Sequence, residues 1–309
     1  MTIMDCRPFL AVGVSFLAAV LISFSRRYPN VRESWSVIAS FIKFGLIISM
    51  VPGVLAGVTY EWTLFQITDT IGFTLRADSA GILFACLAAL LWIPINFYSI
   101  GYMRCNNEHE QTGYFAAFAI CMSSVMGIAM ASNLLTFFFF YELLTIASYP
   151  LVLHKRNEEA LLASRKYLIY TLISGQLFLA GLVAVYCISG TMDFKAGGFL
   201  TTDMAPTWQL QLIFLIMILA GSVKAAVMPL HGWLPAAMIA PTPVSALLHA
   251  VAVVKTGVFA VLRIIGFVFG PKLLADIGTA DILAWFAAGS IIISSLIAIQ
   301  QDNLKRRLA

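Results

Sequence analysis

The chain has 309 residues, of which 61% are hydrophobic and only 11% are charged. A soluble protein of this length needs a polar surface that so few charges cannot supply, so the composition excludes a soluble enzyme or nucleic-acid-binding protein. The formal charge of +4 is better explained by orientation in a membrane than by nucleic acid.

Repeated apolar runs of about 20 residues predict an all-α polytopic membrane protein with about nine transmembrane helices. The first run shows no small-residue cleavage site, so we interpret it as a retained span and not as a removed signal peptide. The predicted spans are 8–25, 35–59, 79–101, 113–131, 133–153, 165–189, 208–228 with a continuation to 240, 243–268 and 281–300.

Two connections have a recognisable composition. Residues 59–78 alternate β-branched and aromatic side chains, which predicts a short extracytoplasmic hairpin. Residues 191–207 are rich in Gly, Thr and Asp and predict a loop. Basic residues gather on one side of the membrane, at 26–32, 104, 155–166 and 305–307, if the N-terminus is outside. The positive-inside rule therefore predicts that orientation, in what we take to be a bacterial inner membrane.

The seventh span is predicted to be a broken helix. Pro229, Pro235, Pro241 and Pro243 crowd this region, and each internal proline removes a helix hydrogen bond. Freed backbone survives at membrane depth only where protein or a water-filled cavity satisfies it. Ion-coupled transporters build sites at such breaks, and here Lys224 precedes the break while His231 follows it. A simple hairpin between two ordinary spans is the alternative.

Ionisable residues at membrane depth are costly, so they are candidates for an ion or proton path. Glu142 is the only acidic residue that lies deep within a predicted span. Lys224 lies in another span, so an ion pair between the two is plausible. Burial favours a neutral lysine whereas a nearby carboxylate favours a charged one, so their separation could switch the proton affinity of Lys224.

Lys255 and His249 lie in the eighth span, about 240° apart around an ideal helix, so they do not share a face directly. They could still flank one water-filled path. His249 could equally be a packed core histidine, and His231 could simply satisfy the broken backbone. Lys43 is expected to reach the interface by snorkelling, in a structural role. For Arg263, anchoring and gating are both open.

Several chemistries lack their sequence signals. No phosphate-binding loop, nicotinamide or flavin fingerprint, or cysteine cluster is present, and the five cysteines are scattered. We therefore expect no cofactor and no metal site.

Three strings resemble one family: FYELLTIASYPLVLHK, GSVKAAVMPLHGWLPAAMIAPTPVSALLHAVAVVKTGVF and the terminal QQDNLKRRLA. They are similar to the antiporter-like, proton-translocating subunits of respiratory complex I, membrane-bound hydrogenases and Mrp Na+/H+ antiporters. SIGYMRCNNEHEQTGYFA and SALLHAVAVVKTGVF look closest to the D-type subunit of Mrp antiporters. The resemblance implies that Glu142 and Lys224 form a charge pair, with Lys255 next along a hydrated axis.

The resemblance also implies an organisation into inverted five-helix repeats. We expect an N-terminal segment at 1–112, a first repeat at 113–269, and a second repeat that begins at 281–309 and is cut short. The predicted function is a proton-conducting subunit of a multisubunit Na+/H+ antiporter, with other integral membrane subunits, protons and possibly Na+ as partners. A proton-pumping subunit of complex I or a membrane-bound hydrogenase is the first alternative. A truncated scaffold that transports nothing is the second.

Overall fold

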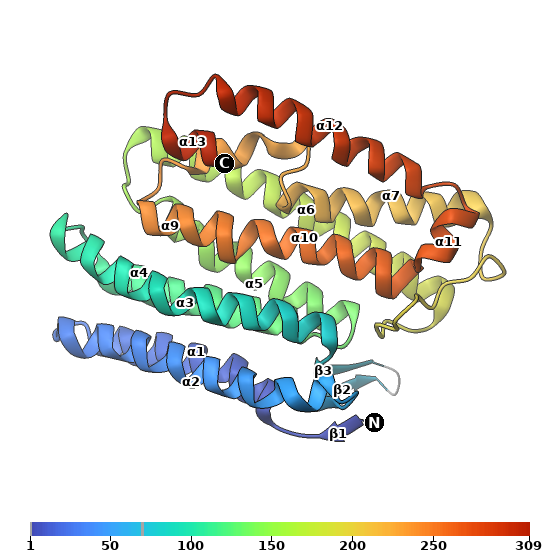
Figure 1. Ribbon diagram of the computed structural model, residues 1–309, viewed down its shortest axis with the longest axis horizontal. Coiled ribbons are helices and arrows are strands. Elements are labelled where there is room, and N and C mark those ends of the chain that lie inside the picture. Colours follow the sequence, from blue (N-terminus) through green and yellow to red (C-terminus); the bar gives the residue numbers. More distant parts are fainter. Residues whose placement is uncertain (1, 69–70) are drawn as a thin grey trace.

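A computed structural model describes residues 2–68 and 71–309 of the chain. Long helices lie side by side with their axes roughly parallel, as expected for a bundle that crosses a membrane (Figure 1). In chain order the elements are β1 (Thr2–Met4), α1 (Arg7–Phe24), α2 (Pro29–Leu55), β2 (Thr59–Thr68), β3 (Ile71–Ala77), α3 (Ser79–Cys105), α4 (Gln111–Ala129), α5 (Leu134–Val152), α6 (Glu158–Ser189), α7 (Thr207–Lys224), η1 (Leu230–Gly232), α8 (Trp233–Ala237), α9 (Thr242–Ala246), η2 (Leu247–Val251), α10 (Val253–Arg263), η3 (Ile264–Phe269), α11 (Pro271–Asp276), α12 (Ala280–Ile299) and α13 (Leu304–Leu308).

The predicted number of spans is confirmed for the described part of the chain. Nine helical segments there are long and apolar enough to cross a membrane, and the eighth of them joins α9, η2, α10 and η3 over Thr242–Phe269. The second span begins at Pro29, earlier than the predicted 35, with proline in the first turn, where its missing N–H leaves no intrahelical bond unmade. Which end of the bundle faces the cytoplasm stays a prediction.

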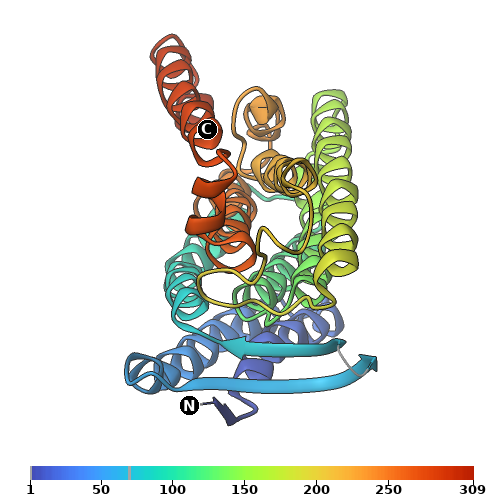
Figure 2. The same cartoon turned by 90° about the vertical axis from the view of Figure 1, so that its right-hand side faces the viewer.

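The core of the bundle lies around α4, because 78% of its apolar window is buried. Helix α1 packs on α4 and α2, and α5 packs on the other side of α4. By contrast, α12 has none of its apolar window buried and lies at the outer edge of the bundle in both views (Figures 1 and 2). The charged residues of the predicted relay lie on helices between these two extremes.

A small sheet crosses one end of the bundle (Figure 2). The predicted hairpin is confirmed as β2 and β3, which pair antiparallel, while the turn residues 69–70 lie outside the described residues. Strand β1 pairs parallel to β2 and was not expected from the sequence. Arg76 of β3 donates to the backbone oxygens of Ser132 at 2.9 Å and Phe194 at 3.1 Å. These bonds fasten the hairpin to two loops at that end.

Arg263 joins the eighth span to the N-terminal part of the bundle. Its guanidinium is 1% exposed and pairs with both carboxylate oxygens of Asp78, Nη1 to Oδ2 at 2.5 Å and Nη2 to Oδ1 at 2.9 Å. Asp78 also caps α3 by accepting from the N–H of Gly81 at 2.7 Å. Of the two roles left open for Arg263, this contact supplies anchoring of α10 against α3.

Candidate functional site

The seventh span is broken, as predicted, but the break begins at Lys224 and not near residue 228. Ala226 has a left-handed φ of 57°. Its N–H donates to Val223 O at 3.1 Å, and the N–H of Val227 donates to Ser222 O at 3.0 Å. This pair of bonds is a Schellman motif, which closes a helix before any proline is reached. The chain then continues through η1 and α8, so Lys224 is the last residue of α7.

Lys224 is fully buried, and its ammonium group contacts Tyr141 of α5. The Nζ atom donates to the backbone oxygen of Tyr141 at 2.5 Å and lies 3.2 Å from the centroid of the Tyr141 ring. The Tyr141 hydroxyl pairs with Ser174 Oγ at 3.1 Å and donates to Ala220 O at 3.1 Å, which fixes the ring. The C-terminal end of α7 also favours a positive charge at this position, because of the helix dipole.

Glu142 follows directly after the carbonyl that Lys224 binds. The Glu142 carboxylate lies against Gly175 of α6, and its Oε1 is buried with no hydrogen-bond partner among the described residues. Glu142 and Lys224 interact electrostatically, but no ion pair within 4.0 Å joins them in the described chain. The direct pair considered from the sequence is therefore not formed here. The two charges are held as neighbours, with a peptide carbonyl at the ammonium.

Helix α10 packs directly on the end of α7. A Cβ added at Gly257 of α10 would overlap the backbone of Lys224 and Ala225. Only a glycine allows this close approach of two backbones. Sequence analysis singled out the charged residues but neither Gly175 nor Gly257. Small residues within charged apolar motifs are the signal that could have found them, because tight packing of membrane helices requires them.

A cavity of about 620 Å³ brings His231 and His249 together with the segment that follows Lys224. Residues 225–228 line one side of it, and α12 and α13 line another. The Nδ1 atoms of both histidines are buried without a hydrogen-bond partner in the described chain. Polar groups in a cavity of this size can be bridged by water. The two imidazoles are thus placed where one hydrated volume reaches both.

The eighth span is irregular where the sequence predicted a regular helix. His249 lies in the π-helical turn η2, and Ala252 has φ −104° and ψ −84°, outside the helical range. The ideal-helix angle between His249 and Lys255 is therefore wrong, and these two residues interact electrostatically. Lys255 is exposed on α10 and does not line the cavity of the two histidines.

Lys43 does not snorkel to the interface. It lies near the middle of the 27-residue helix α2 and is fully buried. Its Nζ donates to Met122 O at 2.9 Å and lies 4.6 Å from the centroid of the Trp92 ring. The prediction failed because the second span was started six residues too late, which placed Lys43 too near the end of the helix.

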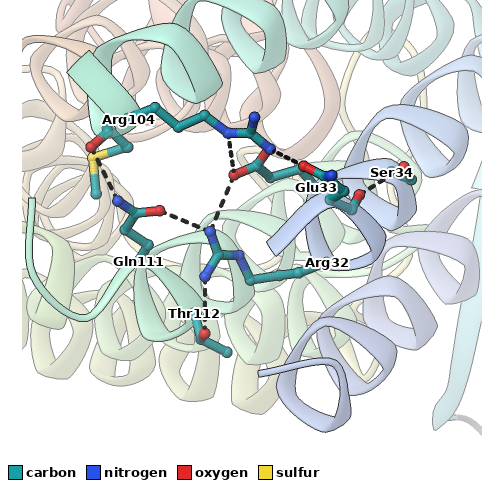
Figure 3. A network of polar contacts seen from close by, with 8 residues as sticks. Arg32, Glu33, Ser34, Arg104, Gln111 and Thr112 are labelled. Carbon is teal, nitrogen blue, oxygen red and sulfur yellow. Dashed lines mark hydrogen bonds and ion pairs between the residues drawn. The ribbon is translucent and has the colours of Figure 1, made fainter. Parts of the chain in front are cut away.

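A buried network joins α2, α3 and α4 at one end of the bundle (Figure 3). Glu33, 4% exposed, accepts from Arg32 at 3.1 Å and from Arg104, and Arg32 reaches Gln111 at 2.8 Å and Thr112 at 3.2 Å. Glu33 is therefore a second acidic residue inside a helix, which the sequence boundaries had placed outside one. The two arginines compensate its charge, so we interpret the network as structural.

A family model described as NADH:quinone oxidoreductase/Mrp antiporter, TM, matches residues 131–309, which are more than half of the chain. The A-type subunit of the Na(+)/H(+) antiporter of Alkalihalophilus pseudofirmus is 30% identical over 299 residues, covering 95% of this chain and 36% of that protein. NAD(P)H-quinone oxidoreductase chain 5 of Picosynechococcus sp. is 30% identical over 278 residues, covering 87% and 40%. This chain thus spans well under half the length of these relatives.

The fold matches a chain in the structure of the membrane-bound sulfane sulfur reductase, an archaeal respiratory membrane complex. The TM-score is 0.85 at 21% identity, and the match covers 98% of this chain and 62% of that chain. That identity shows the fold alone. The relatives named here are an A-type antiporter subunit and a quinone oxidoreductase chain 5, so the likeness to the D-type subunit stays a prediction. The spans, the fold and the family match together show that this integral membrane chain belongs to the NADH:quinone oxidoreductase/Mrp antiporter transmembrane family.

Proposed function

We propose that this chain conducts protons as a subunit of a multisubunit Na+/H+ antiporter, through Glu142, Lys224 and Lys255. The observation that carries the proposal is the placement of a fully buried lysine at a broken helix end, next to an intramembrane carboxylate. Such charges are expensive at membrane depth and mark ion or proton pathways. Family membership supports the same role.

The geometry offers a way to load and release a proton at Lys224. A carboxylate that approaches a buried amine favours the charged ammonium, and one that withdraws favours release of the proton. The Glu142 carboxylate is not hydrogen-bonded through Oε1, so it can move without breaking a bond there. A shift of Glu142 toward or away from Lys224 would then change the proton occupancy of the lysine.

The released proton has a plausible route through water. The cavity beside residues 225–228 contacts His231 and His249, whose Nδ1 atoms have no protein partner in the described chain. Neutral imidazole can accept and pass on a proton near neutral pH. Lys255 interacts with His249 electrostatically, so it is the next group of the proposed relay.

The nature of the exchanged ion rests on the relatives. The Alkalihalophilus pseudofirmus protein is named as part of a Na(+)/H(+) antiporter, which supports exchange against Na+ by an assembly in a bacterial inner membrane. The Picosynechococcus relative is named as a quinone oxidoreductase chain. It supports the second candidate, in which redox chemistry in partner subunits drives the same proton path.

The proposal is tested on the assembly that contains this chain, reconstituted in vesicles with a pH-sensitive dye inside. Glu142→Gln and Lys224→Ala should each abolish proton movement driven by a Na+ gradient, without loss of assembly. Lys272→Gln, a change of an exposed lysine in α11, is the matched control and should transport like the unmodified assembly.

Three outcomes separate the alternatives. Proton movement that follows an electron donor and quinone, and not a Na+ gradient, would support the redox-driven candidate. Unaltered transport by either site variant would contradict the relay. An assembly that transports normally without this chain would favour the scaffold.

A further inference from the structure

A second cluster of ionisable side chains lies at the end of the bundle opposite the sheet. Glu108 and His109 belong to the turn between α3 and α4, and His154 follows the end of α5. One ligand atom from each of the three lies within 4.8 Å of the others. Sequence spacing did not reveal the cluster, because His154 is far from the other two in the chain.

The His154 side chain is only 5% exposed and lies 3.5 Å from Glu108, measured between Nε2 and Oε2. Its Nε2 has no hydrogen-bond partner in the part of the chain that the structure describes. The ring stacks on that of His109, with centroids 4.7 Å apart, and meets the Tyr114 ring edge-on at 5.8 Å. A buried polar atom without a partner is costly, so a native structure that keeps one calls for a ligand there.

We infer that Glu108, His109 and His154 form a binding site for a divalent transition metal ion of the Zn2+ type. Two imidazoles and one carboxylate are a donor set that such ions prefer, and three protein ligands leave one position open. A cavity of about 110 Å³ borders His154 and offers room for a water molecule as the fourth ligand. His109 is exposed, so the ion can enter from solvent.

The neighbouring carboxylate is occupied by another partner. Glu110 pairs with Arg156 at 2.5 Å, which joins the α3–α4 turn to the α5–α6 turn. Glu108 is therefore the carboxylate of this turn that faces the imidazoles. A bound ion would add a second link between these turns and would restrain the end of α5, the helix that carries Glu142. The inference does not depend on proton transport.

Metal binding to the purified whole chain in detergent tests the inference directly. ZnCl2 and CoCl2 are titrated after chelator treatment, with bound metal measured by elemental analysis and Co2+ by its visible absorption. We expect one ion per chain, with a Co2+ spectrum typical of low coordination number. Glu108→Gln and His109→Asn should weaken Zn2+ binding by more than the roughly 10–100-fold that loss of an outer-shell partner costs.

Two further comparisons make the outcome decisive. Glu159→Gln, a change of an exposed carboxylate at the start of α6, is the control and should bind Zn2+ like the unmodified chain. Hydrogen exchange in residues 104–112 and 150–157 should slow on addition of Zn2+, and not in the His109→Asn variant, whose exposed side chain is not needed for packing. Absence of stoichiometric binding, or unchanged affinity in both ligand variants, would overturn the inference.

Discussion

The carboxylate of Glu142 lies against the bare Cα of Gly175, across the contact between α5 and α6. A Cβ at position 175 would overlap the carboxyl carbon and Oε1 of Glu142. The glycine thus makes the space in which the charged group is held. Small residues have this function throughout membrane helix packing, where close approach replaces the hydrophobic effect as the source of association.

Gly175→Ala should displace Glu142 while leaving the bundle folded. Overpacking of this kind costs about 1–3 kcal/mol. The proton transport rate should fall about tenfold or more, since ~1.4 kcal/mol at the reacting geometry corresponds to a factor of ten. Transport by the reconstituted assembly and thermal unfolding in detergent are measured together.

The control for this variant is Gly101→Ala in α3, where an added Cβ would meet nothing within 4 Å. It should transport normally and be as stable as the unmodified chain or slightly more so, because alanine is the better helix former. Normal transport by Gly175→Ala would show that the position of Glu142 does not matter.

Asp78→Asn should be strongly destabilising. It removes the bidentate partner of Arg263, whose side chain is 1% exposed, and leaves a buried charge uncompensated. Breaking a buried pair in this way costs about 3–5 kcal/mol. The melting temperature in detergent should drop clearly, whereas Asp203→Asn, in the exposed loop before α7, should leave it unchanged. Equal melting temperatures for the two variants would mean that the Arg263–Asp78 pair does not anchor α10.

Asp193 makes stability depend on pH. Partial burial raises the pKa of its carboxyl, and the nearby charge of Arg76 offsets part of that rise. Because the folded pKa lies above the unfolded value of about 3.9, the stabilising contribution is full below that value and is lost as the pH rises through the folded pKa. Asp193→Asn should therefore raise the melting temperature at pH 7, and the gain should shrink as the pH falls toward 4. A gain that is the same at both pH values would contradict this.

The spans and the broken seventh helix were predictable because apolar length and proline crowding act locally. The end of α7 at Lys224 was not, since Ala226 adopts a left-handed conformation that favours glycine and that its sequence does not announce. The burial of Lys43 depends on Met122 and Trp92 of other helices. Contacts of this kind arise only once the helices pack.

The same limit applies to the candidate site. Glu142, Lys224, His231 and His249 stood out as ionisable residues in apolar surroundings, and the structure places them in two adjoining groups. The π-helical turn at His249 changed the relation of that residue to Lys255, because periodicity assumes a regular helix. The cluster around His154 joins segments distant in sequence, so no local pattern could reveal it.

A double-mutant cycle at Glu142 and Lys224 tests the central claim most directly. Proton transport rates are compared for the unmodified assembly, Glu142→Gln, Lys224→Met and the double variant, at equal assembly. If the two residues act as one unit, each single change abolishes transport and the double variant is no worse than either single one, because the effects of coupled residues do not add. Transport at the unmodified rate in either single variant would contradict the account.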